Sequence, residues 1–182
     1  MSNQAVVVVD LQNEYLATGK LPLVNIDRAL QNAKRVIENA RSQNIPVIHI
    51  RHEDITPEAG FFVPNTDGVN IVDSVRPSND EAVITKNYPN SFLKTALLEL
   101  LQKQGIENLI IIGAMSHICI DATTRAASDL GFKCILLEDA CATMDLEFNS
   151  VSVPAAQVHA AFMAALGFAY ADVKTTESYL ST

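Results

Sequence analysis

Short apolar runs alternate with amphipathic stretches along this chain. Residues 5–9 are one alanine and four valines, a run too short for a helix and apolar on both faces, as buried parallel strands are. Residues 26–40 repeat apolar side chains at steps of three and four, which predicts a helix that Asn44 and Pro46 end. Further apolar runs predict strands over residues 46–50, 82–85, 108–113, 133–137 and 168–173.

More helices are expected between these strands. One is capped by Asn90 and closed by Gly105, and two others span about residues 119–130 and 154–166, the last being stopped by Gly167. Strands that alternate with helices predict an α/β fold, a three-layer sandwich with a central six-stranded, mainly parallel, Rossmann-like sheet. Ligands of such sheets bind beyond the carboxyl ends of the strands, so this edge is where a site is expected.

Residues 52–80 form a long polar segment without a helical or strand period. Loops of this length inside a compact domain are usually functional. Phe61 and Phe62 are consecutive in it, so at least one is expected to face outward, as a core anchor, a lid or a subunit contact. We expect both phenylalanines, together with Tyr88 after the third strand, to contact the substrate.

Composition and charge limit the kinds of molecule that this chain is expected to bind. Apolar residues make up 48% of the chain, and 182 residues suit a single domain over 1–182. A net charge of -8 argues against a nucleic-acid or anionic-membrane surface and leaves a small-molecule substrate. Cys119, Cys134 and Cys141 cannot all pair within the chain, and no secretory leader precedes them, so a reducing cytoplasmic setting is expected.

Polar residues follow three of the predicted strands. Asp10 comes directly after the first strand, Lys86 after the third, and Cys119 shortly after the fourth, at the expected start of a helix. If the strands are parallel, these side chains gather at one edge of the sheet. A nearby ammonium and a helix N-terminus both favour a thiolate, and a carboxylate can take the thiol proton. The hypothesis is that Cys119 attacks an acyl carbon and forms a thioester that water hydrolyses.

Each of the three residues also has an ordinary explanation when taken alone. Asp10 could cap a helix, Lys86 could be a surface lysine, and Cys119 could be a small buried hydrophobe. Two other functions stay open at this point. A phosphate-handling enzyme could use Asp10, although position 12 is Gln12 rather than a second aspartate, and a binding protein could keep the fold without activity.

Three segments carry a resemblance to a known family. Residues 6–15 (VVVVDLQNEY), 83–92 (VITKNYPNSF) and 113–127 (GAMSHICIDATTRAA) resemble the isochorismatase-like cysteine hydrolases, which include nicotinamidases, N-carbamoylsarcosine amidases and ureidoacrylate hydrolases. The resemblance implies that Asp10 is an acid/base, Lys86 its companion lysine and Cys119 the nucleophile.

The same resemblance implies the geometry around the cysteine. A non-proline cis peptide is expected between Ala114 and Met115, with the amides of Met115 and Cys119 forming an oxyanion hole. Gln12 matches an Asp-x-Gln pattern and is expected to orient Asp10 or the substrate.

Departures from the family narrow the reaction. True isochorismatases lack the cysteine, so Cys119 favours hydrolysis of an amide, carbamoyl or ureido C–N bond over cleavage of a vinyl ether. Nicotinamidases carry an Asp-x-His metal pattern that is absent here. His49 and His52 would point to opposite faces of a strand and are interpreted as ordinary polar residues, so we expect no metal and no cofactor.

Two more histidines remain. His117 could line the pocket and contact substrate, or satisfy backbone groups of the turn. His159 is expected in packing or at an interface, because the alanine-rich last helix with Phe162 and Met163 offers an apolar face. Because proteins of the family that this chain resembles commonly associate, the resemblance implies a homodimer or a higher homo-oligomer.

Overall fold

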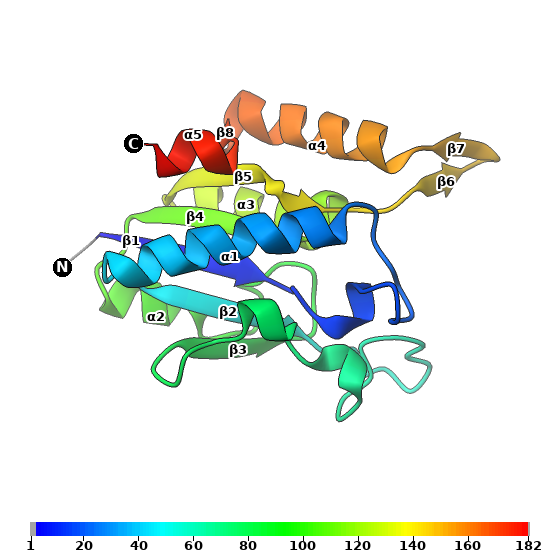
Figure 1. Cartoon of the computed structure of the whole chain (residues 1–182), viewed down its shortest axis with the longest axis horizontal. Coiled ribbons are helices and arrows are strands. Elements are labelled where there is room, and N and C mark those ends of the chain that lie inside the picture. Colours follow the sequence, from blue (N-terminus) through cyan, green and yellow to red (C-terminus); the bar gives the residue numbers. More distant parts are fainter. Residues whose placement is uncertain (1–2, 182) are drawn as a thin grey trace.

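The structure is a computed structural model that describes residues 3–181. Its centre is a six-stranded parallel sheet with the order β3-β2-β1-β4-β5-β8 (Figure 1). The predicted sheet is therefore confirmed. Its strands are β1 (Gln4–Val9), β2 (Val47–His52), β3 (Ala82–Lys86), β4 (Asn108–Ala114), β5 (Lys133–Ala142) and β8 (Asp172–Lys174).

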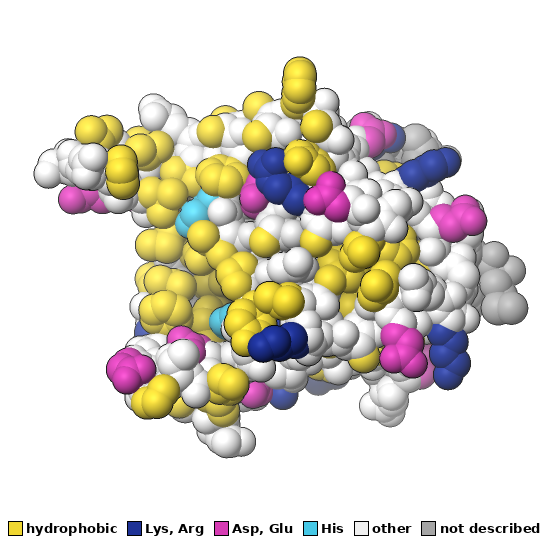
Figure 2. Space-filling view, turned by 180° about the vertical axis from the view of Figure 1, so that it is seen from behind, with side chains coloured by type: hydrophobic (Ala, Val, Ile, Leu, Met, Phe, Trp, Pro, Cys, Tyr) yellow, Lys and Arg dark blue, Asp and Glu magenta, His cyan; other side chains and the backbone are white. Residues whose placement is uncertain are grey.

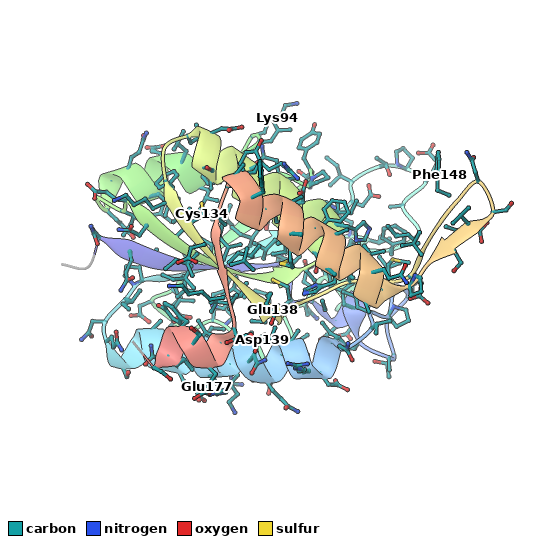
Figure 3. The ribbon with its side chains drawn as sticks, turned by 90° about the horizontal axis from the view of Figure 1, so that it is seen from above. Lys94, Cys134, Glu138, Asp139, Phe148 and Glu177 are labelled. Atoms are coloured by element: carbon teal, nitrogen blue, oxygen red, sulfur yellow. The ribbon has the colours of Figure 1, made fainter. Side chains whose placement is uncertain are left out.

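Helices cover both faces of the sheet. The helices α1 (Ile26–Ser42) and α5 (Thr176–Leu180) lie on one face, as Figure 3 shows. The other face carries α2 (Leu97–Lys103), α3 (Asp121–Asp129) and α4 (Ala155–Ala169). The arrangement is the three-layer sandwich that the sequence predicted. Within residues 3–181 no helix has both the length and the apolar character needed to cross a bilayer.

The valines of β1 explain why that strand is apolar throughout. Val6 and Val8 pack into the core beneath α1, whereas Val7 and Val9 pack into the core on the opposite face. Successive side chains of a strand point to opposite faces, so a strand buried on both sides shows no alternation.

Helix boundaries differ from the expected ones at two places. Residues 91–96 form turns, and α2 begins only at Leu97; the Asn90 side chain instead accepts a hydrogen bond from the Phe92 amide at 2.9 Å. Gly167 does not stop α4, which runs on to Ala169, so β8 starts at Asp172 rather than at residue 168. A side chain at Gly167 would lie 3.3 Å from Val173, so the glycine lets α4 pack closely on β8.

A hairpin that the sequence did not predict projects from the sheet. The strands β6 (Leu146–Phe148) and β7 (Val151–Val153) pair in an antiparallel ribbon whose labelled Phe148 stands at the tip in Figure 3. Phe148 is 76% exposed, and Phe168 on α4 is 92% exposed. Met163, which was expected on the exposed apolar face of α4, is buried in the core, and self-association stays a prediction.

Candidate active site

The carboxyl ends of three strands bring Asp10, Lys86 and Cys119 together. The Lys86 ammonium lies 2.7 Å from Oδ2 of Asp10 and donates a hydrogen bond to Sγ of Cys119 at 3.3 Å. All three residues are buried. The sequence-predicted trio is therefore one cluster, at the sheet edge where the parallel fold predicts a site.

Strand order explains why the third member is a lysine. Lys86 ends β3, and β2 separates β3 from β1, so its side chain must cross the end of β2 to reach Asp10. The long lysine stem spans this gap, and the residue it crosses is His52, its partner in the β2–β3 register. The Lys86 ammonium lies 3.2 Å from Nδ1 of His52. Three acceptors thus surround the three protons of the ammonium.

The charges at the site favour a protonated thiol. Burial lowers the pKa of Lys86, but the Asp10 carboxylate and the Cys119 sulfur outweigh it, so this pKa is raised. The pKa of Cys119 is raised well above the ordinary thiol value by burial and by the Asp10 carboxylate, and Lys86 only partly opposes them. Lys86 favours the thiolate as expected, but its effect does not outweigh burial and the Asp10 carboxylate, so the resting thiol stays protonated. Because α3 begins only at Asp121, the helix N-terminus does not lie at the sulfur.

The turn that carries Cys119 is held by a glycine and a serine. The Ala114–Met115 peptide is cis, as predicted, and the π-helical turn η4 (Ser116–Ile120) follows it. A Cβ at Gly113 would lie 1.9 Å from the Val9 carbonyl oxygen, so only glycine allows β4 to pair with β1 at this point. The Ser116 hydroxyl lies 3.2 Å from the Ala142 carbonyl oxygen and 2.8 Å from Nδ1 of His159.

The predicted oxyanion donors belong to this turn. Within residues 3–181, the Met115 amide donates to none of the hydrogen-bond acceptors, while its carbonyl accepts from the amides of Ile118 at 3.1 Å and Ile120 at 3.2 Å. The Met115 carbonyl is therefore held by two hydrogen bonds within the turn, whereas the Met115 N–H is available to a ligand.

Aromatic rings form a wall beside the cluster. Phe62 is buried and packs edge-on against Tyr15, with ring centroids 5.1 Å apart, and against His52 at 5.3 Å. Phe61 is 42% exposed, so one of the two phenylalanines faces outward as predicted, and Phe62 is the anchor. The pKa of Tyr15 is raised well above its ordinary value by burial, by the Cys119 sulfur and by the Asp10 carboxylate, which places the phenol within electrostatic reach of the cluster.

Comparison with known proteins places this site in a family. Residues 4–170 match the Isochorismatase domain. The chain belongs to the isochorismatase family. An isochorismatase family protein of Bacillus subtilis, YddQ, is 48% identical over 176 residues, which are 97% of this chain and 98% of that protein. The structure of an isochorismatase hydrolase from Oleispira antarctica matches with a TM-score of 0.96 and 47% identity, covering 100% of this chain and 98% of that one.

The isochorismatase family also contains enzymes that act on C–N bonds. The structure of N-carbamoylsarcosine amidase from Thermoplasma acidophilum matches with a TM-score of 0.82 and 26% identity, and covers 96% of each chain. This chain is accordingly a hydrolase of the isochorismatase family with amidohydrolase relatives.

Gln12 holds the backbone of two residues next to the isochorismatase-family site. Its side chain is buried, and Nε2 donates to the carbonyl oxygens of His52 at 2.8 Å and Val69 at 2.9 Å. Oε1 accepts from the His52 amide at 2.8 Å. The Gln12 side chain thus links the end of β2 to the segment that follows it, while its backbone amide donates to the Asp10 carbonyl oxygen at 2.9 Å. Substrate contact by Gln12 stays a prediction.

Two other predicted contact residues engage neighbours of their own. Tyr88 lies at the surface, where the Lys94 ammonium is 3.2 Å from its hydroxyl and 5.2 Å from its ring centroid. The Nδ1 atom of His117 lies 2.6 Å from the Thr143 hydroxyl, and its ring packs on Phe162. The partner of His117 is a side-chain hydroxyl outside the turn rather than a backbone group of the turn. Substrate contact by Tyr88 or His117 stays a prediction.

The two histidines of β2 differ in role. They lie on opposite faces of the strand, and His52 contacts Lys86 and Phe62 beside the cluster. His49 is buried 3.1 Å from Glu81, which also forms an ion pair with Arg41 at 2.8 Å. Across residues 3–181, no three His, Cys, Asp or Glu side chains form a group suited to a metal ion.

Sequence reasoning missed His52 and Tyr15. Tyr15 closes the first family-like segment, and that position was the available signal. Figure 2 shows the strand-end edge of the molecule hollowed between the β6–β7 hairpin and the segment after β2, with hydrophobic and histidine side chains gathered in the hollow.

Proposed function

We propose that this chain is a cysteine-dependent amidohydrolase that cleaves the C–N bond of a small amide, carbamoyl or ureido compound through a thioester on Cys119. The observation that carries the proposal is the single ammonium of Lys86, 2.7 Å from the Asp10 carboxylate and 3.3 Å from the Cys119 sulfur. The N-carbamoylsarcosine amidase relative supports this bond class.

The first half of the reaction uses the resting protonated thiol. Asp10 takes the thiol proton as the sulfur attacks the acyl carbon, and the Lys86 ammonium offsets the negative charge that moves between carboxylate and sulfur. The carbonyl oxygen becomes an oxyanion, for which the amides of Met115 and Cys119 are the proposed donors. Asp10 then returns the proton to the leaving nitrogen, which departs as ammonia or an amine.

The second half reverses these roles. Asp10 takes a proton from water, the hydroxide attacks the thioester carbon, and the C–S bond breaks. The proton held by Asp10 returns to the sulfur, so the enzyme is regenerated with its thiol and its carboxylate–ammonium pair. The net reaction consumes one water for each C–N bond cleaved.

Gln12 argues against the alternative use of Asp10 as a phosphate acceptor. It stands where a second aspartate would be expected in such an enzyme, and its side chain is bonded to the backbone of His52 and Val69. The described cysteines are all free, which suits the proposed cytoplasmic location.

The test is ammonia release from a panel of small primary amides, carbamoyl compounds and ureido compounds. The wild-type chain is compared with Cys119→Ala and with Cys134→Ala, which removes another buried thiol away from the cluster. We expect the wild type and Cys134→Ala to release ammonia from at least one class, and Cys119→Ala from none. Release that survives Cys119→Ala, or no release from any class, overturns the proposal.

A further inference from the structure

His52 is held in one orientation by the residues around it. It is the last residue of β2, and both its backbone N–H and its carbonyl oxygen are bonded by the Gln12 side chain, at 2.8 Å each. Its ring packs edge-on against the buried Phe62 ring, with centroids 5.3 Å apart. The His52 backbone is therefore held in place by Gln12, and one side of the imidazole ring is covered by Phe62.

The Lys86 ammonium fixes the tautomer of this ring. An ammonium has donors only, so Nδ1 of His52, 3.2 Å from Nζ of Lys86, must accept. Burial and the charge of Lys86 both lower the pKa of His52, so the ring stays neutral at physiological pH. A neutral imidazole that accepts at Nδ1 carries its proton on Nε2.

The Nε2–H donor of His52 is uncommitted. Within residues 3–181, Nε2 has no hydrogen-bond partner, and the residue is only partly buried. The Lys86 ammonium is already shared among Asp10, Cys119 and His52, so it has no proton left for a ligand. Nδ1 of His52 and Sγ of Cys119 both contact the Lys86 ammonium, at 3.2 Å and 3.3 Å. A substrate group that binds His52 is therefore separated by only a few bonds from the substrate carbon that Cys119 attacks.

We infer that His52 is a specificity-determining residue whose Nε2–H donates to a second acceptor oxygen of the substrate, a carboxylate or carbonyl placed a few bonds from the scissile carbonyl. The inference rests on the proposed function. It narrows the substrate class from simple amides and ureas to those that carry a second oxygen acceptor. A ligand without that oxygen leaves the Nε2–H donor of His52 without an acceptor, which costs binding.

Two substitutions separate this function from a role confined to positioning Lys86. In His52→Asn the side-chain oxygen can replace Nδ1 as the acceptor for Lys86, while the far donor is lost. In His52→Gln the amide nitrogen reaches the position of Nε2 and can restore the donor. If His52 only positions Lys86, His52→Asn should resemble the wild type on every substrate, and His52→Gln should not.

The probes are matched pairs that share a scissile group. Succinamic acid and butyramide form one pair, and N-carbamoylglycine and propylurea form the other; only the acid of each pair carries the second acceptor. We expect His52→Asn to raise the KM of the acid about 10-fold to 100-fold, to change the KM of the uncharged analogue much less, and to be partly rescued by His52→Gln.

Binding provides a readout that does not need turnover. The Kd of each acid and its analogue is measured by calorimetry in Cys119→Ala and in Cys119→Ala/His52→Asn. A preference for the acid that disappears with the second substitution supports the inference even if catalysis by Cys119 fails. Equal or undetectable binding of acid and analogue in both pairs, or a preference that survives His52→Asn, overturns it.

Discussion

The Lys86 ammonium lies 2.7 Å from Oδ2 of Asp10, although the two residues end strands that are not neighbours in the sheet. Both side chains are inaccessible to solvent. A buried charge is costly unless it is paired, and here each charge is the partner of the other. Asp10 and Lys86 also shift the pKa of the Cys119 thiol in opposite directions. The stability of the fold and the proposed chemistry therefore both depend on the contact between Asp10 and Lys86.

Removing the carboxylate should activate the thiol while abolishing turnover. Asp10→Asn takes away the charge that raises the pKa of Cys119 and leaves the Lys86 ammonium to stabilise a thiolate. We predict that the pKa of Cys119 falls in this variant and that iodoacetamide alkylates it faster at pH 7 than in the wild type. Turnover should fall by about 1,000-fold or more, because the proton acceptor is lost.

Peptide mass spectrometry assigns the alkylation rate to each cysteine. Burial raises the pKa of Cys134 to about 11 and that of Cys141 to about 12, so these thiols serve as internal controls that should not respond. A Cys119 that alkylates more slowly in Asp10→Asn than in the wild type would show that the Asp10 charge is not what raises the pKa of this thiol.

Removing only the ammonium should destabilise the fold. Lys86→Met leaves Asp10 buried without its ion-pair partner, and breaking a buried pair from one side costs roughly 3–5 kcal/mol. The double variant Asp10→Asn/Lys86→Met removes both charges and should regain much of this free energy of unfolding. Urea denaturation of the four proteins measures the coupling. Additive losses in the double variant would contradict a shared ion pair.

The sheet could be predicted from the sequence because its strands are buried on both faces. Runs such as residues 5–9 are then apolar without alternation, and the first and third runs end at Asp10 and Lys86, which mark the functional edge. The hairpin was missed because β6 and β7 have only three residues each. The sequence signal for its turn was Asn149, because asparagine is a common residue in two-residue hairpin turns that require positive φ. Asn149 and Ser150 do have positive φ, at 50° and 63°.

The reactive trio could be predicted for the same reason, since Asp10 and Lys86 lie directly at strand ends and Cys119 lies in the turn after β4. The role of His52 could not, because it depends on Lys86 crossing the end of β2, and strand order is not visible in one sequence. The wall formed by Tyr15 and Phe62 depends on how residues 53–66 fold back over η1 (Asn13–Tyr15), which has no periodic signal.

Gly113 should tolerate no side chain. A Cβ there would lie 1.9 Å from the Val9 carbonyl oxygen, and its φ is +132°. We predict that Gly113→Ala separates β4 from β1 and lowers the free energy of unfolding by about 3 kcal/mol or more. Gly60→Ala is the matched control, because no atom lies within 4 Å of the place that its methyl group would take. Equal thermal stability of the two variants would refute this.

Glu81 should stabilise the fold in a pH-dependent way. Burial raises its pKa, but Arg41, the Ser78 amide and His49 together lower it from 4.5 to about 2. A carboxylate with a lowered pKa stabilises the folded state above the unfolded pKa and loses this contribution as pH falls toward 2. Glu81→Gln should therefore cost roughly 2–3 kcal/mol at pH 7 and progressively less below about pH 4.5.

The control for this prediction is an exposed glutamate. Glu38 pairs with Lys34 at 3.8 Å on the surface of α1, so Glu38→Gln should change the free energy of unfolding by less than about 0.5 kcal/mol at any pH. A Glu81→Gln penalty that stays constant between pH 7 and pH 3 would show that the lowered pKa is not its source.

Covalent trapping of the substrate on the enzyme tests the central claim most directly. Wild-type protein is mixed with a substrate found in the ammonia-release panel, quenched in acid within milliseconds to seconds, digested and analysed by mass spectrometry. The account predicts an acyl adduct on Cys119 that neutral hydroxylamine removes, as expected of a thioester. Rapid-quench samples that release ammonia with Cys119 unmodified at every time point, while Cys119→Ala still turns over, would contradict it.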